Sequence, residues 1–161
     1  MQEHEIFDFQ ILRLTDKFYK NYPKRDYPEL LEKKGRGYNC LLIQTHYDYF
    51  ICIPYRSEIS HKYAFKFHNT KRSQKHKSGL DYTKIVIVKK HEYISTESAM
   101  IDKDEYIKTV RNISRIAKES EEYIEEYVAH MNNECVISEM NFRRKYGMST
   151  LKYFHEELNI K

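Results

Sequence analysis

The sequence contains no apolar run approaching the roughly 18–20 residues that a membrane-spanning helix requires. Its first residues, MQEHEIFDF, also have neither the basic start nor the apolar core of a secretion signal. These two absences argue against a membrane protein and against export. We therefore expect a soluble protein that works in the cytoplasm.

Cysteine is scarce as well. The three cysteines, Cys40, Cys52 and Cys135, are an odd number without CxxC spacing, and the first two lie in apolar runs where a reduced thiol packs as a small hydrophobic group. The eight histidines form neither an HExxH motif nor a cluster with the cysteines. We predict no disulfide, no zinc site and no cofactor.

Several catalytic motifs are missing too. The sequence has no P-loop, no GxSxG, no Ser-His-Asp signature and no paired carboxylates, so the hydrolase classes that depend on these motifs are not supported. No internal repeat and no second domain boundary is visible. At 161 residues we predict a single domain, residues 1–161.

Tryptophan is absent, whereas tyrosine occurs 15 times and phenylalanine 8 times. Tyrosine combines an apolar ring with a polar hydroxyl, so part of this excess suits a surface that faces a polar partner. The alternative is that tyrosine takes the place of other aromatic residues in the core. Composition alone leaves both interpretations open.

Positive charge is concentrated in the middle of the chain, although the formal net charge is only +4. Residues 56–91 contain ten Lys or Arg against two Asp or Glu, whereas residues 92–161 contain ten against fourteen. Aromatic residues alternate with these cations. This combination favours nucleic acid as a partner, because cations hold phosphates while bases stack on rings. A solvated basic loop without function is the alternative.

Strand signals dominate the first half of the chain. Runs rich in aromatic and β-branched residues predict strands over residues 5–14, 38–45, 47–53, 63–67 and 82–89, with a hairpin turn at 46–48. The segments 23–37 and 68–79 are predicted to be exposed, the first with one helical turn at 28–33 and the second as a low-complexity basic loop.

Helical signals dominate the second half. A short helix is predicted from Thr15 or Asp16 to Tyr22, a single long helix capped by Asp102 through Val128, and two short closing helices over 138–146 and 149–158. The charged run at 121–126 is expected to be the solvated face of the long helix. Strands first and helices last indicate an α+β fold, in which an antiparallel sheet carries helices on one side.

The stretch IPYRSEISHKYAF, residues 53–65, concentrates polar chemistry at the end of an apolar run. Pro54 is predicted to end a strand and to place Tyr55, Arg56 and Ser57 on a turn. Cleavage of an RNA phosphodiester without a metal needs a base for the 2′-OH, donors for the phosphate oxygens and an acid for the leaving oxygen. Ser57, Arg56, His61 and Lys62 can supply these groups. Taken singly, each is more commonly an ordinary turn or surface residue.

Three segments together resemble a known family. GRGYNCLLIQ at 35–44, FICIPYRSEISHKYAF at 50–65 and SGLDYTKIVIV at 78–88 resemble the toxins of type III toxin–antitoxin systems, the ToxN/AbiQ superfamily, and look closest to its CptN and TenpN branches. The similarity covers roughly residues 35–90. The rest of the chain has the types of element expected for the family, but its sequence is less specific.

The resemblance implies a partly open antiparallel barrel, distantly similar to the MazF/Kid toxins and flanked by helices. It implies a cytoplasmic, metal-independent endoribonuclease that leaves a 2′,3′-cyclic phosphate. It also implies inhibition by a small pseudoknot RNA antitoxin, which the toxin cuts from a precursor and keeps in a closed protein–RNA assembly. Defence against phage by abortive infection is a further implication, with cellular or phage mRNA as the substrate.

The resemblance also assigns residues. The strand-end serine of the family matches Ser57, and the aromatic residue of the preceding strand matches Tyr38, which would be an orienting hydroxyl. Arg56 stands where the family often has threonine, so the distribution of acid, base and charge-stabilising roles among Arg56, His61 and Lys62 stays open. The RNA contacts expected from the basic and aromatic residues are Lys33, Lys34, Arg36, Tyr55, Tyr63, Lys66, His68, Lys71, Arg72, Lys75, Lys77 and Lys84.

Two other classes of function compete with this prediction. A non-catalytic RNA-binding module would use the same basic and aromatic residues. A DNA-binding regulator would use Arg143, Arg144 and Lys145 of a closing helix, but the acidic C-terminal third would repel most of a duplex.

Overall fold

Six strands form one antiparallel sheet in a computed structural model that describes residues 8–32, 38–44, 47–97 and 99–161. The sheet has the order β1-β2-β3-β5-β4, and β6 pairs with β3 beside this path. The strands are β1 (Asp8–Arg13), β2 (Asn39–Gln44), β3 (Phe50–Arg56), β4 (Ala64–Lys66), β5 (Gly79–Asp81) and β6 (Val86–Val88). Lys33, Lys34 and Arg36, predicted as RNA contacts, lie outside the described residues.

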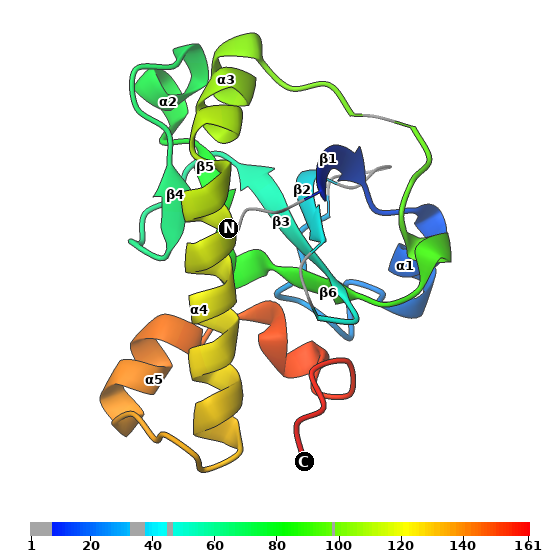
Figure 1. The fold of residues 1–161 in the computed structure, drawn as a ribbon, viewed down its shortest axis with the longest axis vertical. Helices are drawn as coiled ribbons and strands as arrows, with labels where there is room; N and C mark the ends of the chain where they lie inside the picture. The colour runs from blue at the N-terminus through cyan, green and yellow to red at the C-terminus, as the bar shows by residue number, and fades with distance from the viewer. Residues whose placement is uncertain (1–7, 33–37, 45–46, 98) are drawn as a thin grey trace.

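The predicted α+β class is confirmed, and the helices follow the predicted order with corrections. They are α1 (Asp16–Asn21), α2 (Lys71–His76), α3 (Lys103–Arg111), α4 (Ile113–Met131) and α5 (Glu139–Tyr146), with three short 3₁₀ turns η1 (Tyr82–Lys84), η2 (His91–Tyr93) and η3 (Thr150–Tyr153). Figure 1 shows the sheet between α4 on one side and α1 on the other, so the prediction that the helices lie on one side of the sheet is wrong. Among the described residues, no helix has both the length and the apolar character needed to cross a membrane.

The prediction that Pro54 ends its strand is wrong, because β3 continues to Arg56. On one side β3 pairs with β2 from Phe50 to Pro54. On the other side its first residues pair with β6 and its last two, Tyr55 and Arg56, pair with β5. Pro54 falls in the gap between these two ladders, where a missing N–H is tolerated.

The basic segment predicted as a loop contains helix α2. Thr70 and Ser73 form a reciprocal capping box at its start, which satisfies the first backbone donors. The strand predicted over 82–89 is shorter than expected, because a side chain again caps a helical turn. The carboxylate of Asp81 accepts from the backbone N–H of Thr83 at 2.9 Å and starts the turn η1, so β6 begins only at Val86.

The single helix predicted from Asp102 is two helices, divided at Asn112. The amide of Asn112 donates to the carbonyl of Lys108 at 2.8 Å, so its side chain competes with the backbone for the helical hydrogen bonds. At the C-terminus α5 is confirmed, with Ser138 as its cap. The helix predicted over 149–158 is only the turn η3, although Leu151, Phe154 and Leu158 are buried as predicted.

Tyrosine hydroxyls connect the sheet layer to the long helices. Tyr55 shares a 2.9 Å hydrogen bond with Thr109 of α3, and Tyr82 donates to Glu119 of α4 at 2.8 Å. Tyr47 donates to Glu125, so the charged run of α4 is not solely a solvated face. Much of the tyrosine excess is therefore core, as the buried set shows: Tyr49, Tyr55, Tyr82, Tyr93, Tyr123, Tyr127 and Tyr146.

Cys40 and Cys52 pack in this core as predicted, with free thiols. Burial raises the pKa of the Cys40 thiol to about 12. A thiol that stays protonated at neutral pH is a poor nucleophile and a poor metal ligand, so these two cysteines are structural.

Candidate functional site

The centre of the candidate site is Asp81, a fully buried carboxylate at the end of β5. Its Oδ2 accepts from Nη1 of Arg56 at 2.7 Å. Its Oδ1 accepts from the backbone N–H and the hydroxyl of Thr83, at 2.9 and 2.6 Å, and lies 3.2 Å from Nε2 of His61. One carboxylate therefore joins the end of β3, the segment after it and the start of η1.

Asp81 is held as an anion in this environment. Burial by itself would raise the pKa of the carboxyl group, but the hydrogen bonds from His61, Thr83 and Arg56 outweigh that effect, so the pKa lies below its ordinary value. A fixed negative charge of this kind can orient an imidazole and stabilise it when it gains a proton.

The hydrogen-bond pattern assigns the tautomer of His61. The backbone N–H of Tyr63 donates to Nδ1 at 3.1 Å, so Nδ1 is an acceptor and Nε2 carries the hydrogen. Nε2 faces Oδ1 of Asp81, with the hydroxyl of Thr83 at 3.4 Å. The ring is thus fixed in orientation, with both nitrogens engaged.

Arg56 offers more hydrogen-bond donors than the protein uses. Only Nη1 is bound to Asp81, and within the described part of the chain Nε and Nη2 have no acceptor. The side chain is 30% exposed. A guanidinium that is anchored at one nitrogen and open at the others is well suited to hold a phosphate oxygen.

The other predicted catalytic residues surround this cluster less tightly. Ser57 is the first residue beyond β3, half-buried, with no hydrogen bond among the described interactions. Tyr38 immediately precedes β2, and the antiparallel register, with Cys40 opposite Pro54, directs it towards the Arg56 end of β3. Lys62 is exposed, and its ammonium lies 5.7 Å from the ring of Tyr63.

A group of aromatic rings adjoins His61. The rings of His61 and Tyr63 are stacked with centroids 6.0 Å apart. Lys145 of α5 lies 5.8 Å from the ring of Tyr63 and 5.7 Å from that of Tyr123, and it forms a 2.7 Å ion pair with Glu126. The helix α5 therefore forms one wall of the site, and its cation stabilises the rings by a cation–π interaction.

The predicted RNA contacts divide into outward and inward residues. His68, Lys71, Lys75 and Lys77 are exposed on and around α2, while Lys66 and Tyr63 are half-buried. Tyr55, Arg72 and Lys84 point inward instead, which corrects the prediction for these three. Tyr55 is in the core, with its hydroxyl on Thr109.

Arg72 attaches α2 to α3. Its Nε and Nη2 bind the two carboxylate oxygens of Glu105, both at 3.1 Å, and Glu105 also accepts from the hydroxyl of Ser78 at 2.7 Å. Glu105 is almost fully buried. Both of these Arg72 donors are therefore used inside the protein, which explains why the helix lies where the sequence predicted a loop.

Lys84 is buried, and its ammonium donates to the carbonyl of Met148 at 2.9 Å. Burial lowers the pKa of Lys84, with a further lowering from the charge of Arg56, and the attraction of Asp81 opposes both. Lys84 thus connects η1 to the chain after α5 and is not available as an open RNA contact.

The sequence argument missed Asp81 and Thr83, and it named Lys145 only as a phosphate contact of the DNA-binding alternative. A signal for Asp81 was present, since it is one of only two acidic residues in the most basic stretch of the chain and lies between Leu80 and Tyr82. A lone carboxylate there must pair with a cation or become neutral. Nothing in the local sequence indicated that α5 would bring Lys145 to Tyr63.

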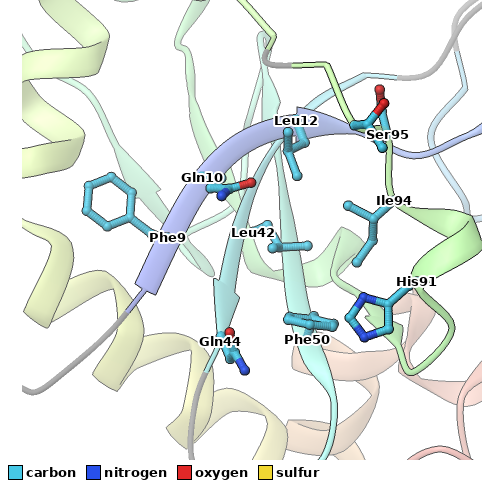
Figure 2. Close-up of a pocket in the computed structure, with 10 residues that line it drawn as sticks. Phe9, Gln10, Leu12, Leu42, Gln44, Phe50, His91, Ile94 and Ser95 are labelled. Carbon is cyan, nitrogen blue, oxygen red and sulfur yellow. The ribbon is translucent and has the colours of Figure 1, made fainter.

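Figure 2 shows a separate cavity of about 430 Å³, where β1, β2 and β3 meet the segment around η2. Its walls combine apolar side chains with Gln10 and Gln44, and the rings of Phe50 and His91 meet edge to face at 5.4 Å. None of the predicted catalytic residues lines it. The cavity is therefore distinct from the Asp81 cluster.

Comparison with known proteins gives no identification. No protein-family model, no curated protein sequence and no solved structure matches this chain. Within the described ranges, no group of three or more His, Cys, Asp and Glu side chains is placed to hold a metal ion.

Proposed function

We propose that this protein is an endoribonuclease that cleaves RNA without a metal, as the toxin of a type III toxin–antitoxin system. The observation that carries the proposal is the connected set Arg56–Asp81–His61 at the end of β3, beside Ser57 and within a basic, ring-lined surface. It combines a phosphate-binding cation, a titratable imidazole and an anion that orients both.

In the proposed step the ribose 2′ oxygen attacks the adjacent phosphorus. The bond from phosphorus to O2′ forms and the bond to O5′ breaks, which leaves a 2′,3′-cyclic phosphate and a 5′-OH. His61 gives up its hydrogen bond from Tyr63, accepts the 2′ proton at Nδ1 and then returns a proton to the leaving O5′. Asp81 stabilises the imidazolium in between.

The remaining residues act on the phosphate. Arg56 donates from Nε and Nη2 to the non-bridging oxygens, where negative charge increases in the transition state. Ser57 donates its hydroxyl to the same group, and Lys62 adds positive charge from the exposed side. Tyr38 orients the ribose. This assignment makes Arg56 and Lys62 charge stabilisers and His61 the acid and base.

The biological setting belongs to the same proposal. A small pseudoknot RNA would be processed by the toxin and then held in a closed protein–RNA assembly in the cytoplasm. Release of the toxin would cleave cellular or phage mRNA and give phage defence by abortive infection. Kinship of the sheet with the MazF/Kid barrels is also part of the proposal, supported by the antiparallel sheet with its split partner strands on β3.

The test is cleavage of RNA by the purified protein in EDTA, with analysis of the ends. We expect 2′,3′-cyclic phosphate ends, and we expect growth arrest on expression without the upstream repeat RNA. His61→Ala and Ser57→Ala should relieve both effects, whereas Lys20→Ala, an exposed α1 residue, should not. Full toxicity of both site variants would remove the assignment.

A non-catalytic RNA-binding module is the second candidate. The observation in its favour is that both ring nitrogens of His61 are engaged, so the imidazole must break a hydrogen bond before it accepts a proton. RNA recovered intact from a stable complex, at every protein concentration, would establish this candidate instead.

A further inference from the structure

A basic groove lies along β4, the last strand in the order of the sheet. It has a volume of about 350 Å³ and separates β4 from the junction of α3 and α4. Its polar lining consists of Lys62, Lys66 and His68 on the strand side and Lys108, Asn112 and Arg115 on the helix side. The helix-side residues were not among the predicted RNA contacts.

The groove carries an excess of positive charge. Among the described residues that line it, four are lysine or arginine and none carries a carboxylate. One of the cations is paired, since Arg115 binds Glu119 at 2.8 Å while its side chain remains 64% exposed. Arg115 also lies 5.1 Å from the ring of Phe65. Several cations converging on a hollow with so little counter-charge favour an anionic ligand.

The edge strand adds backbone donors. Tyr82 donates its N–H to the carbonyl of Tyr63, and Phe67 donates to that of Ser78, so the pairing of β4 with β5 uses alternate residues. In an antiparallel ladder the intervening residues, Ala64 and Lys66, direct their N–H groups away from the partner strand. Both residues also line the groove.

The groove and the Asp81 site are neighbours along the chain and across the sheet. Lys62 lines it and directly follows His61 in the chain. Along β4, Ala64 is opposite Asp81 and Lys66 is opposite Gly79, which is itself paired with Arg56. The groove therefore begins one residue after His61 and borders β4, the strand that pairs with β5, which carries Asp81.

We propose that this groove binds backbone phosphates of the single RNA strand that flanks the scissile bond, with Lys108 and Arg115 as the contacts from the helices. The identity of the ligand as RNA rests on the proposed function, whereas the affinity of the groove for an anionic chain does not. Because it touches phosphates and not bases, the groove contributes affinity and strand direction without sequence preference.

The test compares wild type with Lys108→Ala/Arg115→Ala. The probe is a short fluorescein-labelled single-stranded RNA, and its Kd is measured by anisotropy at several salt concentrations. Each single-strand phosphate contact contributes about 0.7 to the slope of log Kd against log salt, so the double variant should lose about 1.4 of that slope. At roughly 0.1 M salt this corresponds to a Kd raised about 25-fold.

Controls separate this effect from a general loss of charge or fold. Lys108→Arg should retain the affinity of wild type, and Lys20→Ala, which removes an exposed lysine on the distant helix α1, should bind like wild type. Cleavage of a dinucleotide, which is too short to reach the groove, should proceed at the same rate in wild type and in the double variant. Thermal unfolding verifies that the variants are folded.

The outcomes distinguish the two proposals. Weakened binding with no cleavage by any variant supports the groove and rejects the nuclease. Cleavage with an unchanged Kd and salt slope in the double variant overturns the groove. Equal binding of polyglutamate, lost to the same degree in the double variant, would overturn RNA as the ligand in favour of an acidic protein segment.

Discussion

Two buried carboxylates in this protein have similar partners but different geometry. Asp81 and Glu105 each face an arginine and a hydroxyl, and the two arginines, Arg56 and Arg72, have nearly equal side-chain exposure, 30% and 29%. Arg72 uses two nitrogens on both oxygens of Glu105, whereas Arg56 uses one nitrogen on Asp81. The difference separates a structural ion pair from one that can still bind a ligand.

The two carboxylates also differ in whether a histidine lies beside them. His61 adjoins Asp81, whereas the contacts of Glu105 are with Arg72 and Ser78. The strand β5 connects the two clusters, because Ser78 precedes it and Asp81 ends it. Gly79 is required there, since a Cβ at this position would lie 2.5 Å from the carbonyl oxygen of Phe65. The same short strand thus supports both the fixed pair and the open site.

Removal of either carboxylate charge should have the largest effect on stability. We expect Asp81→Asn and Glu105→Gln each to lower the free energy of unfolding by about 3–5 kcal/mol, because each leaves a partly buried arginine without its counter-charge. Urea denaturation followed by circular dichroism measures this loss. Glu122→Gln on the exposed side of α4 is the control, with an expected change below about 0.5 kcal/mol. A loss in the control range for either buried site would contradict the comparison.

Two serines, one at each site, should give smaller changes in stability that also distinguish the two sites. Ser78→Ala should cost about 1–3 kcal/mol of stability, because Glu105 loses a hydrogen bond in a buried position, with no effect on RNA cleavage by the folded protein. Ser57→Ala should change stability by less than about 0.5 kcal/mol. It should nevertheless slow cleavage about 100-fold, since it removes a donor to the phosphate. Urea denaturation and single-turnover cleavage are measured on the same preparations of each variant. A loss of cleavage in Ser78→Ala together with a loss of stability in Ser57→Ala would contradict these two assignments.

Acid should weaken the fold through Asp81 by a smaller amount. The pKa of Asp81 in the folded protein lies below its ordinary value of about 3.9, so its contribution to stability is present above that pH and is lost as pH falls through the folded value. The slope from this one group is at most about 1.4 kcal/mol per pH unit. Denaturation in urea across the acid range should show a flatter pH dependence for Asp81→Asn. Identical profiles for variant and wild type would exclude this linkage.

Local patterns were sufficient to predict much of the fold. Periodicity and caps located α1 and α5, and the apolar runs located β2, β3 and the β4 region. The errors in the element boundaries came from polar side chains that hydrogen-bond to the backbone, which the hydrophobic periodicity does not reveal. Asn112 interrupts the long helix, the Thr70–Ser73 pair starts α2, and Asp81 starts η1.

The candidate site was predictable only in part, for a physical reason. Arg56 and His61 were identified because they are close in sequence and chemically suited to RNA cleavage. Asp81, which joins them, is 20 residues further along the chain than His61 and reaches it only through the β3–β5–β4 pairing. Arg72 was assigned to the surface because its partner, Glu105, lies on a helix more than 30 residues away.

The most direct test compares the two arginine clusters by the rate of RNA cleavage in EDTA. We predict that Arg56→Ala lowers the single-turnover rate about 100-fold or more, because the phosphate loses its charged donor. Arg72→Met/Glu105→Gln removes the other ion pair with both charges, so the protein should stay folded and should cleave at the wild-type rate. Equal rates for Arg56→Ala and wild type, or equal losses in the two variants, would contradict the assignment of the Asp81 cluster as the site.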